Sequence, residues 1–159
     1  MILEPAFFSI NDNSHSVFNE DSNQLIKSIS GDILYLDPPY NAREYGANYH
    51  LLNTIAKYDD FMPKGKTGLR EYKRSLYCKR GEVVNSFEEL IKNANFKYIF
   101  LSYNNEGLMA SETIKNILSK YGRYDLATTD YQRFRADKKE NRNHKANSTV
   151  EFLHILEKF

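Results

Sequence analysis

The segment Leu34–Tyr40, which reads Leu-Tyr-Leu-Asp-Pro-Pro-Tyr, constrains the fold of this chain more than any other. The residues from Gly31 to Leu36 are rich in β-branched, leucine and aromatic side chains, which predicts a short buried strand. Asp37 then stands at the carboxyl end of that strand, where open α/β sheets place their ligand-binding groups. The segment therefore predicts an α/β fold with a functional loop at this strand end.

The two prolines make this loop stiff, because each fixes its own φ, removes a backbone donor and restricts the residue before it. The Asp37 carboxylate and the Pro38 carbonyl are therefore held as acceptors beside the Tyr40 ring. An exocyclic amino group on a flat base matches this set, since two acceptors take its N–H bonds while Tyr40 stacks on the ring. Such a base has to leave the duplex. A Pro-Pro turn with a surface aspartate is the alternative interpretation of these four residues alone.

The Asp-Pro-Pro-Tyr motif at residues 37–40 resembles the catalytic motif of amino-directed DNA methyltransferases. The longer string Tyr35–Asn41 and the later run Phe100–Gly107 are similar to the adenine-specific class that includes the Dam enzymes, and especially to bacterial restriction–modification methylases. The similarity covers nearly the whole chain, from about Val17 to the end. In this class an aspartate at the first motif position implies adenine N6 as the methyl acceptor. The implied catalytic residues are Asp37, Pro38, Pro39 and Tyr40.

The resemblance implies S-adenosylmethionine as the methyl donor and no metal ion. Residues 18–21 fall where the family places a strand-end contact to the adenosine of the cofactor, so Asp21 joins Asp37 as an implied cofactor-binding residue. Asp21 followed by Ser22 is also typical of a helix N-cap. The sequence leaves both interpretations of Asp21 open.

The family builds most of its cofactor pocket from a segment that we do not find here. That segment contains a Phe-x-Gly-x-Gly-like loop and a later acidic residue, whereas none of the seven glycines of this chain forms a Gly-x-Gly pair. The chain also leaves no room for the target-recognition region that precedes the motif in Dam-like enzymes. We therefore interpret residues 1–159 as one domain, the catalytic half of a methyltransferase, in which the cofactor-binding glycine loop and the recognition region are absent.

The implied fold is a partial Rossmann-like methyltransferase sheet, mostly parallel, with a C-terminal antiparallel hairpin. The strand before Asp37, an intervening helix and the strand Phe96–Ser102 predict a parallel crossover, which brings the loop after Ser102 next to Asp37. Two later strands, at about residues 123–135 and 148–158, would form the hairpin.

Two helices are predicted between these strands. The run Ser86–Glu89 has the form of a capping box, which places the start of one helix at Ser86. In residues 43–58, Tyr49, Leu52 and Ile55 recur at helical spacing, which predicts a second helix packed on the sheet.

The net charge of +1 gives no sign of nucleic-acid binding, so any such surface must come from local clusters. Residues 59–85 lack hydrophobic periodicity and are rich in Lys and Arg, as is the connection between the last two strands. Basic loops near a base-binding motif are suited to DNA phosphates. The predicted DNA-binding residues are Asn41, Arg43, Lys64, Lys66, Arg133, Arg135, Lys138 and Arg142.

The composition favours a soluble globular protein, with 41% hydrophobic and 27% charged residues. The sequence contains no apolar run of membrane-spanning length and no signal region. The single Cys78 excludes an internal disulfide and fits a reducing cytosol. We therefore expect a cytoplasmic protein without a membrane partner.

These observations lead to the hypothesis of a DNA adenine-N6 methyltransferase, represented by its catalytic C-terminal part and acting on double-stranded DNA in restriction–modification. The apolar strand edge at Ile33–Leu36 predicts a second polypeptide with the missing half, or self-association. Two alternatives stay open: an inactive or partner-dependent half-enzyme that acts as a binding or assembly module, and an RNA adenine methylase.

Overall fold

A computed structural model describes residues 13–132 and 148–159, and these residues form one four-stranded sheet with helices around it. The strands are β1 (Ser30–Leu36), β2 (Asn95–Asn104), β3 (Gly122–Gln132) and β4 (Ser148–Lys158). The α-helices are α1 (Ser22–Leu25), α2 (Tyr45–Asn48), α3 (His50–Lys57), α4 (Val83–Asn93) and α5 (Ser111–Leu118), and a 3-10 helix, η1, spans Leu76–Cys78.

The strand order in the sheet is β1-β2-β4-β3. β1 and β2 are parallel, with Leu36 opposite Leu101, whereas β4 is antiparallel to both β2 and β3. The α/β class, the parallel crossover and the C-terminal antiparallel pair are confirmed. The prediction of a mostly parallel sheet is wrong, because β4 returns between β2 and β3 and therefore runs against both of its neighbours.

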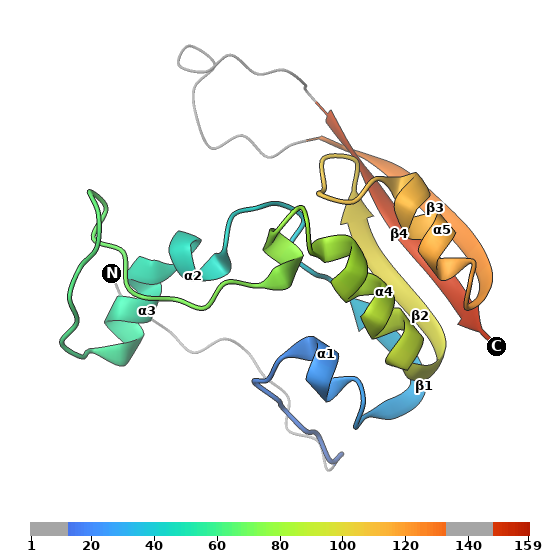
Figure 1. The fold of residues 1–159 in the computed structure, drawn as a ribbon, viewed down its shortest axis with the longest axis horizontal. Helices are drawn as coiled ribbons and strands as arrows, with labels where there is room; N and C mark the ends of the chain where they lie inside the picture. Colours follow the sequence, from blue (N-terminus) through green and yellow to red (C-terminus); the bar gives the residue numbers. More distant parts are fainter. Residues whose placement is uncertain (1–12, 133–147) are drawn as a thin grey trace.

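The hydrophobic core lies on one face of the sheet, under α4 and α5 (Figure 1). Ile99, Leu101 and Tyr103 of β2 point into it, and each is 0% exposed. Phe87 of α4 and Ile114 of α5 pack against the same cluster. The alternation of buried and half-buried residues along β2 follows from the two-residue period of a strand.

Helix α4 begins at Val83, so the prediction that Ser86 starts this helix is wrong. Val83 is 1% exposed and Ser86 is 6% exposed, which places both on the face of α4 that packs on the protein. Burial of Val83 extends the apolar stripe one turn further than the capping-box pattern indicated. The backbone carbonyl of Ser86 accepts a hydrogen bond from the side chain of Asn23.

Strand β1 forms an edge of the sheet in the described residues. Its outward side chains, Ile33 and Tyr35, are each 62% exposed, whereas Leu34 and Leu36 pack against the core. The prediction of a buried strand is therefore wrong, because no residue of β1 is fully buried and its second face is uncovered in the described residues. The predicted exposed apolar edge is confirmed for Ile33 and Tyr35.

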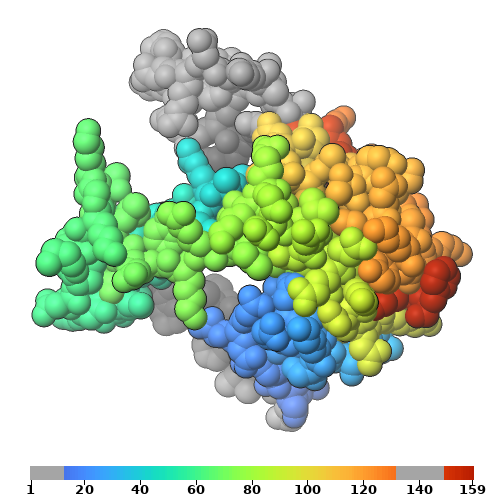
Figure 2. All heavy atoms as spheres, in the orientation of Figure 1, coloured from blue at the N-terminus to red at the C-terminus, as the bar shows by residue number. Residues whose placement is uncertain are grey.

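Residues 45–70 form a projection, the α2–α3 lobe, which extends to one side of the sheet (Figures 1 and 2). Arg70 fixes its loop, since the guanidinium lies 2.6 Å from Asp59 Oδ1 and 4.1 Å from the centre of the Phe61 ring. The prediction that the helix in residues 43–58 packs on the sheet is wrong. Leu52 and Ile55 are 59% and 65% exposed, because the lobe carries their apolar stripe away from the core.

Candidate active site

The loop after β1 meets the loop after β2 at the carboxyl ends of these two parallel strands. The backbone N–H of Leu108 donates to the carbonyl of Tyr40 at 2.8 Å, and the Tyr40 hydroxyl lies 2.8 Å from Ser102 Oγ. The prediction that the two loops come together is therefore confirmed. It follows from parallel pairing, which places equivalent strand ends at one edge of a sheet.

The Tyr40 hydroxyl holds the carboxylate of Asp37. It donates a hydrogen bond of 2.7 Å to Asp37 Oδ1, and Ser102 then serves as the donor to the Tyr40 oxygen. Burial is the largest cause that raises the pKa of Tyr40 to about 12, and Asp37 adds to it, so this hydroxyl keeps its proton at neutral pH. Asp37 itself is exposed, which leaves its other acceptor positions open to a ligand.

The Tyr40 ring is half-buried and meets Tyr103 edge-on, with 5.0 Å between the ring centroids and 61° between the ring planes. Tyr103 in turn accepts a hydrogen bond from the backbone N–H of Met109 at 3.2 Å. The sequence indicated the ring of Tyr40 as a stacking surface but not the contact of its hydroxyl with Asp37. The Tyr40 hydroxyl has a second partner in Ser102, which lies 62 residues further along the chain.

A cavity of about 280 Å³ opens beside the loop of residues 37–40. Leu36, Asp37, Pro38 and Pro39 form one wall, and Phe87 and Leu90 of α4 form the apolar base. Ser22, Ser75 and Tyr77 complete the lining. A mostly apolar cavity with a few polar groups is typical of a small-molecule site.

Asp21 caps helix α1, because its Oδ1 accepts hydrogen bonds from the backbone N–H groups of Asn23 and Gln24 at 3.0 and 3.2 Å. The helix-cap interpretation is confirmed. The cap sets the direction of the next residue, Ser22, which lines the cavity of Asp37. The role of Asp21 in cofactor binding stays a prediction.

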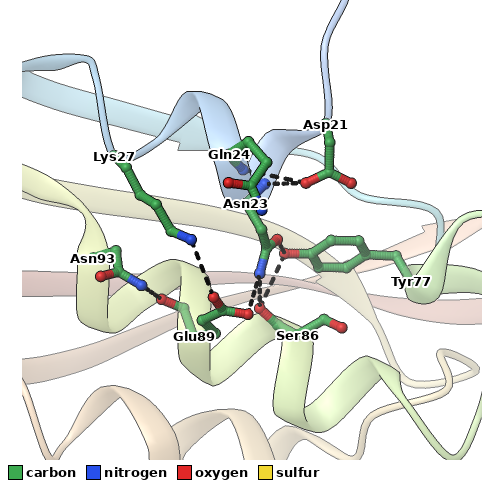
Figure 3. Close-up of polar contacts among 8 residues, drawn as sticks. All are labelled: Asp21, Asn23, Gln24, Lys27, Tyr77, Ser86, Glu89 and Asn93. Atoms are coloured by element: carbon green, nitrogen blue, oxygen red, sulfur yellow. Dashed lines mark hydrogen bonds and ion pairs between the residues drawn. The ribbon is translucent and has the colours of Figure 1, made fainter.

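The buried Asn23 ties α1, η1 and α4 together (Figure 3). The Asn23 amide donates to the Ser86 carbonyl at 2.8 Å and to Glu89 Oε2 at 3.3 Å, and its oxygen accepts from the Tyr77 hydroxyl at 2.8 Å. Burial raises the pKa of Tyr77. The network fixes α1 and η1 against α4, and thereby fixes two walls of the cavity. The sequence did not indicate it.

The predicted DNA-binding residues lie in different places. Asn41 accepts a hydrogen bond from the backbone N–H of Arg43 at 2.8 Å, so its side chain shapes the turn that follows Tyr40. Lys64 and Lys66 are exposed in the α2–α3 lobe. Four other residues lie outside the described residues, namely Arg133, Arg135, Lys138 and Arg142.

Residues 13–132 and 148–159 contain no cluster of three or more His, Cys, Asp or Glu side chains suited to a metal ion. Within the same ranges, no helix combines the length and apolarity that a membrane crossing requires.

Comparison with known proteins assigns the chain to a family. The model of the D12 class N6 adenine-specific DNA methyltransferases matches residues 3–117, and the chain belongs to this family. It is 69% identical over 156 residues to the type II methyltransferase M.NlaIII of Neisseria lactamica. The aligned region covers 98% of this chain and 47% of that protein. It is 43% identical over 150 residues to the type II methyltransferase M.FokI of Planomicrobium okeanokoites. Here the aligned region covers 91% of this chain and 23% of that protein.

The chain spans about half of M.NlaIII and about a quarter of M.FokI. No solved structure matches it.

Proposed function

We propose that this chain carries the catalytic loop of a DNA adenine-N6 methyltransferase of the restriction–modification type. One observation carries the proposal: the Asp37 carboxylate is exposed at the end of β1 and is oriented by the Tyr40 hydroxyl at 2.7 Å, in a motif of the D12 family. A fixed and accessible acceptor is what an exocyclic amino group requires.

The reaction depends on how the amino group of the target adenine is held. Asp37 and the Pro38 carbonyl accept its two N–H bonds, which directs the nitrogen lone pair away from the loop. The Tyr40 ring lies against the base after it has left the duplex. Bound S-adenosylmethionine would supply the methyl group and keep its sulfur as a neutral thioether, and no covalent enzyme intermediate would be needed. The residues of this chain would contribute the positioning of the amino group and local electrostatics. Asp37 accepts the proton that the amine releases and passes it to water.

The cavity of about 280 Å³ fits part of an S-adenosylmethionine molecule, because it combines an apolar base with the Asp37 carboxylate and several hydroxyl groups. That cofactor supplies a methyl group on a positively charged sulfur. Asp37 and Ser22 would contact its polar parts, while Phe87 and Leu90 would cover apolar surface. Asp21 would lie near the adenosine, at the start of α1.

A further polypeptide segment, in the same chain or in a second one, would complete this site. The exposed side chains of β1 support this proposal, since Ile33 and Tyr35 are each 62% exposed beside the cavity wall. An uncovered apolar strand edge is a surface that proteins normally protect. A strand paired to this edge would also bring new residues next to Asp37.

The proposal is tested with the chain and the part of M.NlaIII that it does not match, mixed as two polypeptides; we call this mixture the complemented chain. It is incubated with duplex DNA and S-adenosylmethionine that carries a labelled methyl group, and the DNA is then digested to nucleosides for mass spectrometry. We expect label in N6-methyladenine. Label in N4-methylcytosine, or transfer to RNA but not to DNA, would overturn the proposed function.

A further inference from the structure

A second hollow, separate from the cavity of Asp37, lies between the start of α2 and residues 72–79. Its volume is about 450 Å³, and Arg43, Arg74 and Lys79 line it together with Asn48. We call it the basic hollow. Arg43 follows Tyr40 by three residues, so the basic hollow adjoins the catalytic loop.

The charges in the basic hollow are not balanced. Three cationic side chains line it, whereas Glu44 is the single carboxylate in its lining. Glu44 Oε1 accepts a hydrogen bond from the backbone N–H of Ser75 at 2.9 Å. In the described part of the chain, no carboxylate lies within ion-pair distance of Arg43, Arg74 or Lys79. The basic hollow therefore presents a net positive charge to solvent.

Close contacts hold the two sides of the basic hollow together. The Cys78 Sγ lies 3.8 Å from the Arg43 carbonyl, in addition to the bond between Ser75 and Glu44. Gly46 packs so closely on Tyr72 that a Cβ at Gly46 would lie 2.6 Å from the Tyr72 Cβ. These contacts fix the two backbone segments that carry the three cationic side chains, so the segments need not be ordered when a ligand binds.

We infer that the basic hollow binds a phosphate of the DNA backbone next to the target nucleotide. The inference rests on the proposed function and deepens it. A phosphate accepts several charge-assisted hydrogen bonds, and arginine forms them in pairs. Such contacts fix the register of a protein on DNA without reading its sequence. A phosphate held three residues from Tyr40 would fix the strand from which the adenine is turned out.

The test compares two double variants that remove one arginine and one lysine each. Arg74→Ala with Lys79→Ala empties the basic hollow of two cations. Lys97→Ala with Arg123→Ala is the control, because both residues are exposed. They lie near the amino ends of β2 and β3, at the end of the sheet opposite to the Asp37 loop. Circular dichroism first confirms that both variants keep the fold. Binding of a fluorescent duplex is then followed by anisotropy over a series of salt concentrations.

We expect the variant of the basic hollow to bind DNA severalfold more weakly. Its plot of log affinity against log salt concentration should be shallower by about 0.9, which is the change for one lost phosphate contact. The control should keep the slope of the unaltered chain. An unchanged slope in the first variant, an equal loss in both variants, or no DNA binding by the unaltered chain would each overturn the inference. Because the readout is binding, the two proposals can fail separately: the expected slopes together with a complemented chain that methylates no adenine would refute only the proposed function.

Discussion

Asp37 and Tyr40 act as a pair through one hydrogen bond of 2.7 Å. Tyr40→Phe keeps the ring and removes the donor, so the carboxylate loses its orientation. A hydrogen bond to a charged group contributes about 1.5–3 kcal/mol, and the lower end of this range, which suits an exposed carboxylate, corresponds to a roughly tenfold loss of rate. Tyr40→Ala removes the ring as well and should be far slower.

Single-turnover methyl transfer by the complemented chain measures both Tyr40 variants. A Tyr40→Phe variant as fast as the unaltered protein would show that the hydroxyl has no role. Equal losses in the two variants would show that the ring has none.

His154 makes stability depend on pH. It is 0% exposed in β4, its Nδ1 lies 2.9 Å from the Tyr124 hydroxyl, and burial lowers its pKa from 6.5 to about 4. The native state therefore binds this proton less well than the unfolded state. The free energy of unfolding is therefore not reduced by His154 above about pH 6.5. It should fall by a total of about 3 kcal/mol as the pH decreases from about 6.5 toward about 4.

Urea unfolding at a series of pH values measures this effect. His154→Gln removes the titrating group and keeps a polar side chain, so its stability should change less than that of the unaltered chain between about pH 6.5 and 4. Parallel pH profiles for the two proteins would contradict the role of His154.

At the scale of elements, the loop from β2 to α5 depends on Gly107. A Cβ at this position would lie 2.1 Å from the Tyr103 ring, which is fully buried and supports Tyr40. Gly107→Ala should therefore cost about 1–3 kcal/mol of stability through overpacking. Gly81→Ala is the matched control, since no atom lies within 4 Å of its Cβ position, and its effect should stay within about 0.5 kcal/mol. Thermal unfolding compares the two, and equal melting temperatures would refute this account of Gly107.

The elements that surround the motif could be predicted from sequence, because their signals are local. A strand that ends in Asp-Pro-Pro, followed by a helix and another apolar strand, has few possible arrangements. The packing of α3 could not be predicted in this way. The spacing of Leu52 and Ile55 indicates an amphipathic helix. It does not identify the surface against which the apolar side of the helix packs. The capping-box pattern at Ser86 failed because buried Val83 extends the helix by a turn.

Long-range side-chain contacts account for the part of the site that the sequence did not reveal. Asn23 and Tyr77 lie 54 residues apart, and their hydrogen bond shapes the cavity of Asp37. Neither residue belongs to a motif, and the bond exists only because α1 and η1 both pack on α4. The same holds for Ser102 beside Tyr40.

At the scale of the whole molecule, the described residues leave apolar surface uncovered at β1. Ile33 and Tyr35 point away from the core at the sheet edge, so we expect the isolated chain to associate with itself. Replacing both residues by lysine should reduce this association. Asn116→Lys with Ser119→Lys is the control, because it adds the same charge at exposed positions on and beside α5.

Sedimentation velocity at several concentrations measures the association of all three proteins. We expect the edge variant to move toward the monomer, while the control follows the unaltered chain. A monomeric unaltered chain at high concentration would contradict the expectation.

The central claim is that Asp37 orients the adenine amino group, and one rate comparison tests it most directly. Methyl transfer to DNA by the complemented chain is measured for the unaltered sequence, Asp37→Ala and Asp32→Ala. Asp32 is the control, since it is an exposed aspartate near the opposite end of β1. Loss of a positioned polar contact in an active site costs roughly 100-fold or more in rate. We predict a loss of that size for Asp37→Ala and an unchanged rate for Asp32→Ala; an Asp37→Ala rate within a few-fold of the unaltered protein would contradict the account.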